Sequence, residues 1–313
     1  MSPLQSVAFR FQLSDWTLFS IQRRLQVRAF GIGDSVTELD QLPPLLPESC
    51  GVMLRSLPVN TASVGIRKLD LGGQRLLSYV LQRFPRYYID MAQSFEDYKA
   101  KFSGKTRSTL SRKIRKFAEL GGGQIRWERF TRADDLERFW QLARQVSIKT
   151  YQERLLDAGL PDDLAFYEQA RRLADADNLR AFLLFDGERP VSYLFCPVRE
   201  GIIEYAYLGY DPEYLRLSVG TVLQWLALES LFAEQRFHYF DFTEGESEHK
   251  RLFATGSVSC ANIALLRPTL TNRLLAHSHH RFGRFTEALG GWLERHELKT
   301  RVKHWLRFGR AAA

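Results

Sequence analysis

Apolar and polar positions alternate along the first part of the chain, a pattern that is typical of strands. Residues 6–30 alternate well enough for two strands, and more strand-like pieces follow a proline-rich break in QLPPLLPE. From Ser94 the apolar period becomes helical, and Ser94 and Asp97 have the spacing of a capping box. The pattern therefore predicts a strand-rich N-terminal half over residues 1–93.

Helical spacing of apolar residues returns several times after this point. It predicts a helix in the basic stretch GKTRSTLSRKIRKFAELGGG, which the glycines at 121–123 end. It also predicts helices over residues 133–148 and 162–176.

The clearest pattern lies in the second half of the chain. Three antiparallel strands joined by tight turns are predicted from the runs LRAFLLFD, VSYLFCPVR and IIEYAYLGY. A helix over residues 220–234 follows, and then a strand, a short helix and a last strand in FHYFDFTEG, EHKRLFA and VSCANIALL. A meander followed by a helix and another strand builds a mixed, mostly antiparallel α/β sheet, and not a doubly wound parallel one.

Composition narrows the class of protein. The chain has 313 residues and 45% hydrophobic content, enough to bury one large core or two modest ones. No run of about 18 apolar residues is present, and MSPLQSVAFRFQLSDW lacks the apolar stretch of a secretory signal. Cys50, Cys196 and Cys260 form no paired motif, so neither a metal site nor a disulfide framework is expected. These features favour a cytoplasmic protein.

The formal net charge is +8, and the basic excess is concentrated in two segments. Residues 101–116 hold seven lysines and arginines and no acidic residue, and residues 267–310 hold ten against three glutamates. Such segments attract polyanions, anionic lipids or cofactor phosphates, although a solvated helix face has the same composition. Residues 267–313 are predicted to be a basic amphipathic helical tail that contacts the inner face of an anionic membrane peripherally. Its histidines, such as His279, lack metal-site spacing and are expected to be solvated.

A candidate phosphate site lies where GYDPEYLRLSVGTVLQW turns into the predicted helix. The first N–H groups of a helix are unpaired and the helix dipole adds partial positive charge. A diphosphate fits there when side chains stand clear and a cation is near. A serine or glycine at this place can equally serve only as a cap. The residues that would hold the diphosphate are Arg216, Ser218, Val219, Gly220, Thr221 and Val222.

Four stretches, in this order, carry a resemblance to a known family. They match a basic helix with closing glycines, a β-hairpin, a strand–turn–helix with a phosphate-type turn, and a signature of Asp, Gly and Lys. The stretches are SFEDYKAKFSGKTRSTLSRKIRKFAELGG, DGERPVSYLF, GYDPEYLRLSVGTVLQWLALESLF and FDFTEGESEHKRLFA. Together they resemble the GNAT acyltransferases, most closely the BioF2-like or CelD-like branch, a relative of the FemAB peptidyltransferases.

This resemblance implies a GNAT fold over residues 94–266 and, as in FemAB proteins, a degenerate GNAT-like half before it. It implies an enzyme that moves an acyl group from acyl-CoA, either acetyl-CoA or a longer chain, to an amine, without a metal. The implied acceptor is a small-molecule or glycan-precursor amine, such as an amino sugar of a cell-envelope or polysaccharide precursor. The pantetheine arm would pair along an open strand edge beside IIEYAYLGY.

The implied chemistry needs a base for the acceptor ammonium and a donor for the oxyanion. The candidates for the base are Asp241, Glu244 and Glu246, with Lys250 as a positive neighbour. A backbone N–H near Tyr207 would bind the oxyanion, and the hydroxyl of Tyr207 or Tyr210 would protonate the leaving thiolate. Without the resemblance, the same residues have a structural interpretation. Asp241 would then be a cap, and the charged residues after it would form surface ion pairs.

Two departures from the family pattern leave the donor and the acceptor open. His249 stands where an aromatic residue is usual, and Thr243-Glu244 replace Gly-Arg, which turns a basic spot acidic. A FemAB-like transferase that uses aminoacyl-tRNA or acyl carrier protein is an alternative, because either anionic donor suits the basic segments. A non-catalytic membrane-surface or nucleic-acid binding module is the third possibility.

Overall fold

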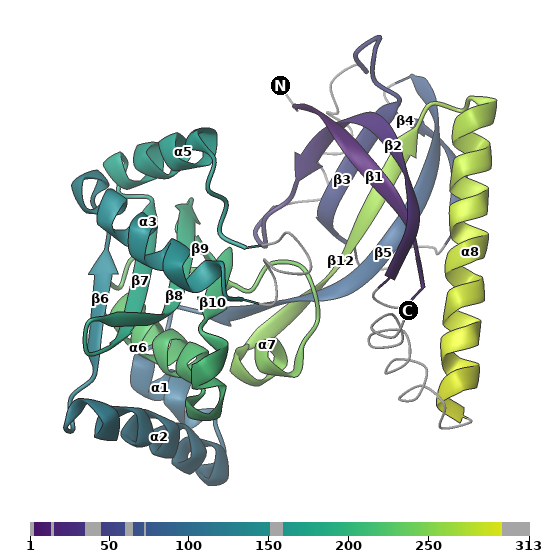
Figure 1. Ribbon diagram of the computed structural model, residues 1–313. Coiled ribbons are helices and arrows are strands. Elements are labelled where there is room, and N and C mark those ends of the chain that lie inside the picture. Colours follow the sequence, from purple (N-terminus) through teal and green to yellow (C-terminus); the bar gives the residue numbers. More distant parts are fainter. Residues whose placement is uncertain are drawn as a thin grey trace, which may run out of the picture. The chain divides into compact units, whose positions relative to one another are not determined.

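The computed structural model describes residues 3–13, 16–34, 45–59, 65–71, 73–150 and 159–295 (Figure 1). The chain forms two compact units. Unit 1 consists of residues 1–85 and 258–313, and unit 2 of residues 86–257. The division therefore runs inside a strand near residue 86, not at residue 93, and the chain returns to unit 1 at its end.

Unit 1 is built on a mixed sheet, as the alternating pattern of residues 6–30 predicts. The strand order is β1-β2-β3-β12-β5, and β4 pairs with β5. Most of these pairs are antiparallel, but β2 and β3 are parallel. The strands are β1 (Leu4–Leu13), β2 (Trp16–Ala29), β3 (Gly51–Pro58), β4 (Ile66–Leu71), β5 (Gln74–Asp90) and β12 (Gly256–Leu266).

Helix α8 (Leu270–Arg295) forms the described part of the basic tail and packs on this sheet. Leu275 and Ala276 are buried in the same cluster as the inward residues of β1. His279 is not solvated as expected, because its Nδ1 lies 2.6 Å from the Tyr79 hydroxyl and its ring packs edge-on against Phe11. The rest of the tail lies outside the described residues, so its contact with a membrane stays a prediction.

Unit 2 has the mixed α/β architecture that the sequence predicts. From the end of β5 the strand order is β11-β9-β8-β7-β6, with β10 paired to β8. Among the described strands of this unit, only β11 and β9 pair in parallel. The strands are β6 (Arg126–Phe130), β7 (Leu179–Asp186), β8 (Arg189–Arg199), β9 (Ile202–Glu204), β10 (Tyr207–Tyr210) and β11 (Tyr239–Asp241).

Helices cover both faces of this sheet, because successive side chains of a strand point to opposite faces. On β7, Phe182 and Leu184 belong to a cluster with one set of helices, and Leu183 and Phe185 belong to a cluster with the other set. The first set is α1 (Phe95–Ala100), α2 (Gly104–Ala118), α6 (Val219–Ala233) and α7 (Glu248–Phe253). The second set is α3 (Ala133–Ser147) and α5 (Leu164–Asp175), which Figure 1 shows on the opposite side from α6.

The third strand of the predicted meander is broken in two. Its first part, β9, pairs with both β8 and β11, and its second part, β10, pairs with β8. At the break, Tyr205 N–H donates to Asp241 O at 2.8 Å and Ala206 N–H donates to Glu204 O at 2.9 Å. The tight turn leads the chain away from β11, whose last paired residue is Asp241.

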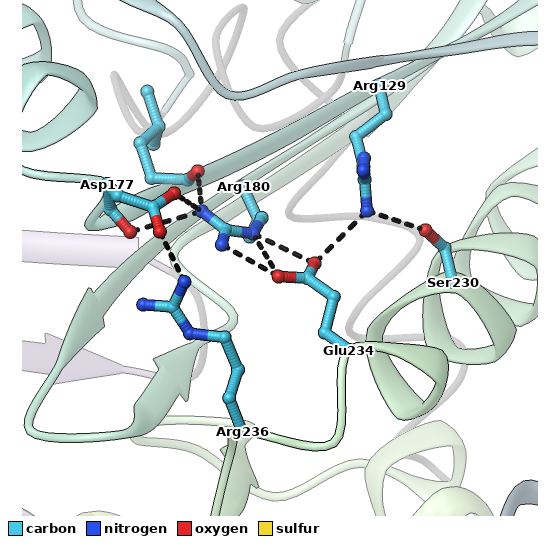
Figure 2. A network of polar contacts seen from close by, with 7 residues as sticks. Arg129, Asp177, Arg180, Ser230, Glu234 and Arg236 are labelled. Atoms are coloured by element: carbon cyan, nitrogen blue, oxygen red, sulfur yellow. Dashed lines mark hydrogen bonds and ion pairs between the residues drawn. The ribbon is translucent and has the colours of Figure 1, made fainter.

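A buried ionic network fixes the C-terminal end of α6 to the sheet (Figure 2). Arg180 on β7 is 3% exposed and donates two hydrogen bonds to Glu234 Oε1 and Oε2, at 2.9 and 2.7 Å. A further guanidinium N–H of Arg180 donates to Asp177 Oδ1 at 2.9 Å. Arg129 of β6 reaches the same Glu234 carboxylate at 3.2 Å. The network ties the end of α6 that lies opposite the predicted phosphate site to β6 and β7.

Candidate functional site

A cavity of about 270 Å³ lies at the N-terminus of α6. Its walls come from the β9–β10 strand, from the turn before α6, from the first turn of α6 and from α7. The lining residues are Tyr205, Leu208, Tyr210, Leu215, Ser218, Val219, Gly220, Thr221 and His249. Four of the residues predicted to hold a diphosphate therefore meet at one cavity.

The helix mouth offers fewer free amides than the sequence predicts. Ser218 adopts a left-handed conformation with φ 54°, and its carbonyl accepts from Thr221 N–H at 2.9 Å and Val222 N–H at 3.1 Å. Within the described residues, no acceptor takes the N–H groups of Val219 and Gly220. The free N–H donors are thus those of Val219 and Gly220. The N–H groups of Thr221 and Val222 are already bonded to Ser218 O and are not available to a phosphate.

Gly220 has a packing role at this helix mouth. A Cβ atom added there would lie 3.3 Å from Leu208 Cδ2 and 3.3 Å from Tyr210 Cδ1. The glycine therefore allows α6 to approach β10 closely. Its missing side chain points to the strand, so it does not by itself indicate a phosphate.

A buried carboxylate holds the turn that leads into α6. Asp211, 1% exposed, accepts hydrogen bonds from Lys149 Nζ at 2.8 Å, from the Arg189 guanidinium at 2.6 Å and from Glu213 N–H at 3.2 Å. Burial alone would raise the pKa of this carboxyl, but the hydrogen bonds outweigh it and the pKa is lowered. The ionised Asp211 therefore fixes the short 3₁₀ helix η3 (Pro212–Leu217), on which the predicted Arg216 is exposed.

Strand β10 presents an edge beside the cavity. On one side it pairs with β8, and among the described strands none pairs with its other side. Leu208 and Tyr210 point from β10 to the α6 side and line the cavity. An extended ligand with amide groups could add along this edge as a further strand would.

His249 and Gln224 form a buried pair at the α7 wall. His249 Nε2 lies 2.6 Å from Gln224 Oε1, and the imidazole ring packs 4.8 Å from the Phe253 ring. Burial, with the charges of Lys113 and Lys250, lowers the pKa of His249 to about 4. The imidazole is therefore neutral near pH 7, with Nδ1 left as the second polar atom of the ring. Within the described residues the buried Gln224 Nε2 has no partner.

This pair makes the stability of the protein depend on pH below neutrality. The unfolded chain binds a proton at His249 near its ordinary pKa of 6.5, and the folded chain does so only near 4. The free energy of unfolding should thus fall as the pH drops from about 6.5 to about 4. A His249→Gln variant, which keeps a donor toward Gln224, should show a shallower fall in urea titrations at several pH values. Parallel profiles for variant and wild type would contradict this assignment.

Asp241 and Lys250, the two central residues of the family signature, build a loop. Asp241 is 0% exposed, and both of its oxygens accept from Arg86 Nε at 3.0 Å. Asp241 Oδ1 also accepts from Thr243 N–H at 2.8 Å, and Lys250 Nζ donates to Glu244 O at 2.5 Å. These bonds hold Thr243 in a left-handed conformation with φ 59°.

The geometry argues against Asp241 as the general base, because its carboxylate is enclosed and occupied by Arg86. Burial lowers the pKa of Lys250, and the charges of Asp241 and Glu244 partly offset this. Glu244 and Glu246 are exposed on the loop that this arrangement holds, and Glu246 Oε1 lies 3.4 Å from the Tyr87 hydroxyl.

Tyr207 lies on the other face of β10 from the cavity. Its ring packs edge-on against Phe166 and Phe195 in the cluster with α3 and α5, and burial raises its pKa. Tyr207 is not among the residues that line the cavity, whereas Tyr205 and Tyr210 are. Arg86 and Gln224 were not predicted as site residues, although each is a polar residue beside apolar ones, and His249 was noted only as a departure from the family pattern.

Among the described residues, no group of three or more His, Cys, Asp or Glu could hold a metal ion. Over the same part of the chain, no helix is long and apolar enough to cross a membrane.

Comparisons with known proteins give a match to one protein family. Residues 104–251 match the family model described as an acetyltransferase (GNAT) domain. No curated protein matches the sequence significantly.

Solved structures with a similar fold include FemX, with 10% identity and a TM-score of 0.49 over 87% of this chain and 90% of that chain. The C-terminal domain of a putative lysylphosphatidylglycerol synthetase from Agrobacterium fabrum has 11% identity and a TM-score of 0.47, over 74% and 72%. A GCN5-related N-acetyltransferase from Kribbella flavida has 12% identity and a TM-score of 0.34, over 62% of each chain. At these values the assignment rests on the family match: residues 104–251 of this chain form a GNAT domain.

Proposed function

We propose that the protein is an N-acyltransferase that moves an acyl group from the thioester of acyl-CoA to an amine. The observation that carries this proposal is the cavity at the mouth of α6, which lies in the GNAT domain and borders the open edge of β10. The free amides of Val219 and Gly220 would hold the diphosphate, and the β10 edge would pair with the amides of the pantetheine.

The acceptor side is proposed from the charge of the loop after β11. Glu244, Glu246 and Glu248 are exposed there, and an acidic surface attracts an ammonium group. One of Glu244 and Glu246 would take the proton that the ammonium must lose before it attacks the thioester. We propose that the acceptor is an amino sugar of a cell-envelope or polysaccharide precursor.

Thr221→Glu tests the diphosphate site. Thr221 lines the cavity in the first turn of α6, a turn that contains no acidic residue, so a glutamate there should not harm the helix. Its charge would face the phosphates, and we expect the Kd of acetyl-CoA or a longer acyl-CoA to rise by roughly 100-fold or more in calorimetry. Thr221→Gln, which has the same shape without the charge, should stay within about tenfold of wild type.

Equal binding by the Glu and Gln variants would contradict a phosphate at this helix mouth. The wild type alone tests the wider proposal, because a specific acyl-CoA well above its Kd should stabilise the fold by a few kcal/mol. The absence of any stabilisation or binding by CoA esters of all chain lengths would overturn it.

A further inference from the structure

The outer face of α2 carries a row of unpaired cations. Lys105, Arg112 and Lys116 are exposed, and at 100° per residue they fall on one side of the helix, opposite the buried Leu110 and Phe117. None of the three forms an ion pair with another described residue. We call these three residues the α2 stripe. Helix α2 itself contains no acidic residue, and the exposed Glu119 stands at its C-cap, one turn after Lys116. The α2 stripe is therefore mainly positive, and such a surface attracts an anionic partner.

The α2 stripe lies on a helix that packs against two elements of the cavity wall. Helix α2 packs against both α6 and η3, which supply the mouth of the cavity. Lys113 of the same helix is close enough to His249, in the α7 wall, for its charge to lower the pKa of that histidine. A partner seated on the α2 stripe would therefore contact the outer face of a helix that packs beside the cavity wall.

The α2 stripe is longer than a small cofactor needs. At about 1.5 Å per residue, the eleven steps from Lys105 to Lys116 span roughly 16 Å. In the proposed function, the amides at the N-terminus of α6 bind the diphosphate of CoA. The cations of the α2 stripe are not needed for that contact and can bind a larger anion. The open β10 edge fits a pantetheine arm, which both CoA and carrier proteins possess and which the 3′ end of a tRNA lacks.

We propose that the α2 stripe docks an acidic acyl carrier protein, which delivers the acyl group on its phosphopantetheine arm. This rests on the proposed acyltransferase function and names the carrier of its donor. In the transfer, the amine nitrogen bonds to the acyl carbon and the carbon–sulfur bond breaks. The proton lost by the amine passes to the base, and the leaving sulfur takes up a proton as the thiol of the carrier. No oxidant or reductant is needed.

The test measures how tightly the full chain binds a fluorescently labelled bacterial acyl carrier protein. The carrier protein is loaded with an acyl group through a stable amide analogue of the thioester. Arg112→Glu/Lys116→Glu should weaken this binding by roughly tenfold or more and reduce its salt dependence, because attraction becomes repulsion. The same variant should bind acyl-CoA within about twofold of wild type, since the two residues face away from the cavity.

Arg171→Glu/Arg172→Glu is the matched control, because these arginines are exposed on α5 and their replacement changes the net charge equally. It should leave binding of the carrier protein unchanged. Acyl-CoA binding with no binding of the carrier protein, or equal losses in both double variants, would overturn the docking proposal and leave the acyltransferase intact. Stripe-dependent binding of tRNA in place of the carrier protein would also overturn it. Failure of acyl-CoA of every chain length to bind would instead contradict the proposed function.

Discussion

Replacing Asp241 with asparagine is expected to lower the free energy of unfolding of unit 2 by roughly 3–5 kcal/mol, the cost of breaking a buried ion pair by removing one partner. Arg86 is only 6% exposed on its side chain and would remain as an enclosed positive charge. Asparagine keeps the acceptor for Thr243 N–H, so the loss would report on the pair with Arg86. Urea denaturation followed by circular dichroism measures it.

A base at Asp241 would give a different result, with activity lost and stability kept. Glu204→Gln serves as the control, because Glu204 lies opposite Asp241 in the β9–β11 register and its pair with Arg199 is partly exposed. The pair of Glu204 with Arg199 should contribute less than about 1 kcal/mol to the free energy of unfolding. A combined Arg86→Met/Asp241→Leu variant, without either charge, should recover much of the stability that Asp241→Asn loses.

The second large effect is expected at the network of Figure 2. Arg180→Gln should lower the free energy of unfolding by roughly 3 kcal/mol, since it removes the buried cation that pairs with the largely buried Glu234 carboxylate. The C-terminal end of α6 would lose its ion pair with β7. Weaker binding of acyl-CoA should accompany the loss if the position of this helix determines the shape of its mouth.

Arg129→Gln is a stringent comparison, because Arg129 donates to the same Glu234 carboxylate but is 41% exposed on its side chain. The Arg129→Gln replacement should lower the free energy of unfolding by less than about 1 kcal/mol. Equal losses of stability in the two variants would show that burial does not determine the strength of these contacts.

The sequence predicts those elements whose pattern is local. The helices expected over 133–148 and 162–176 are α3 and α5, with ends within about two residues, because their apolar stripes and an Asp163 cap are visible along the chain. The GNAT assignment is also confirmed by the family match over residues 104–251. The break between β9 and β10 was not predicted, because IIEYAYLGY alternates without a visible interruption and the turn depends on a bond to Asp241.

The candidate site was predictable only in part, for a similar reason. The residues around Gly220 are consecutive, so their meeting at one cavity follows from a single helix mouth. The partner of Asp241 is Arg86, 155 positions away, and only the folded sheet places the two together. The role of each signature residue therefore depends on contacts that no local pattern records, and the placement of Tyr207 on the wrong face of β10 shows this as well.

The order of the segments also affects how the protein is made. Unit 1 needs β12 to pair with β3, yet about 200 residues, including nearly all of unit 2, are translated between these strands. At about 5–20 residues per second, β3 waits roughly 10–40 s on the ribosome for its neighbour. The whole of unit 2 can fold in that interval. A nascent chain should therefore acquire a formed GNAT domain first, while the N-terminal strands stay incomplete and exposed to chaperones until the end of synthesis.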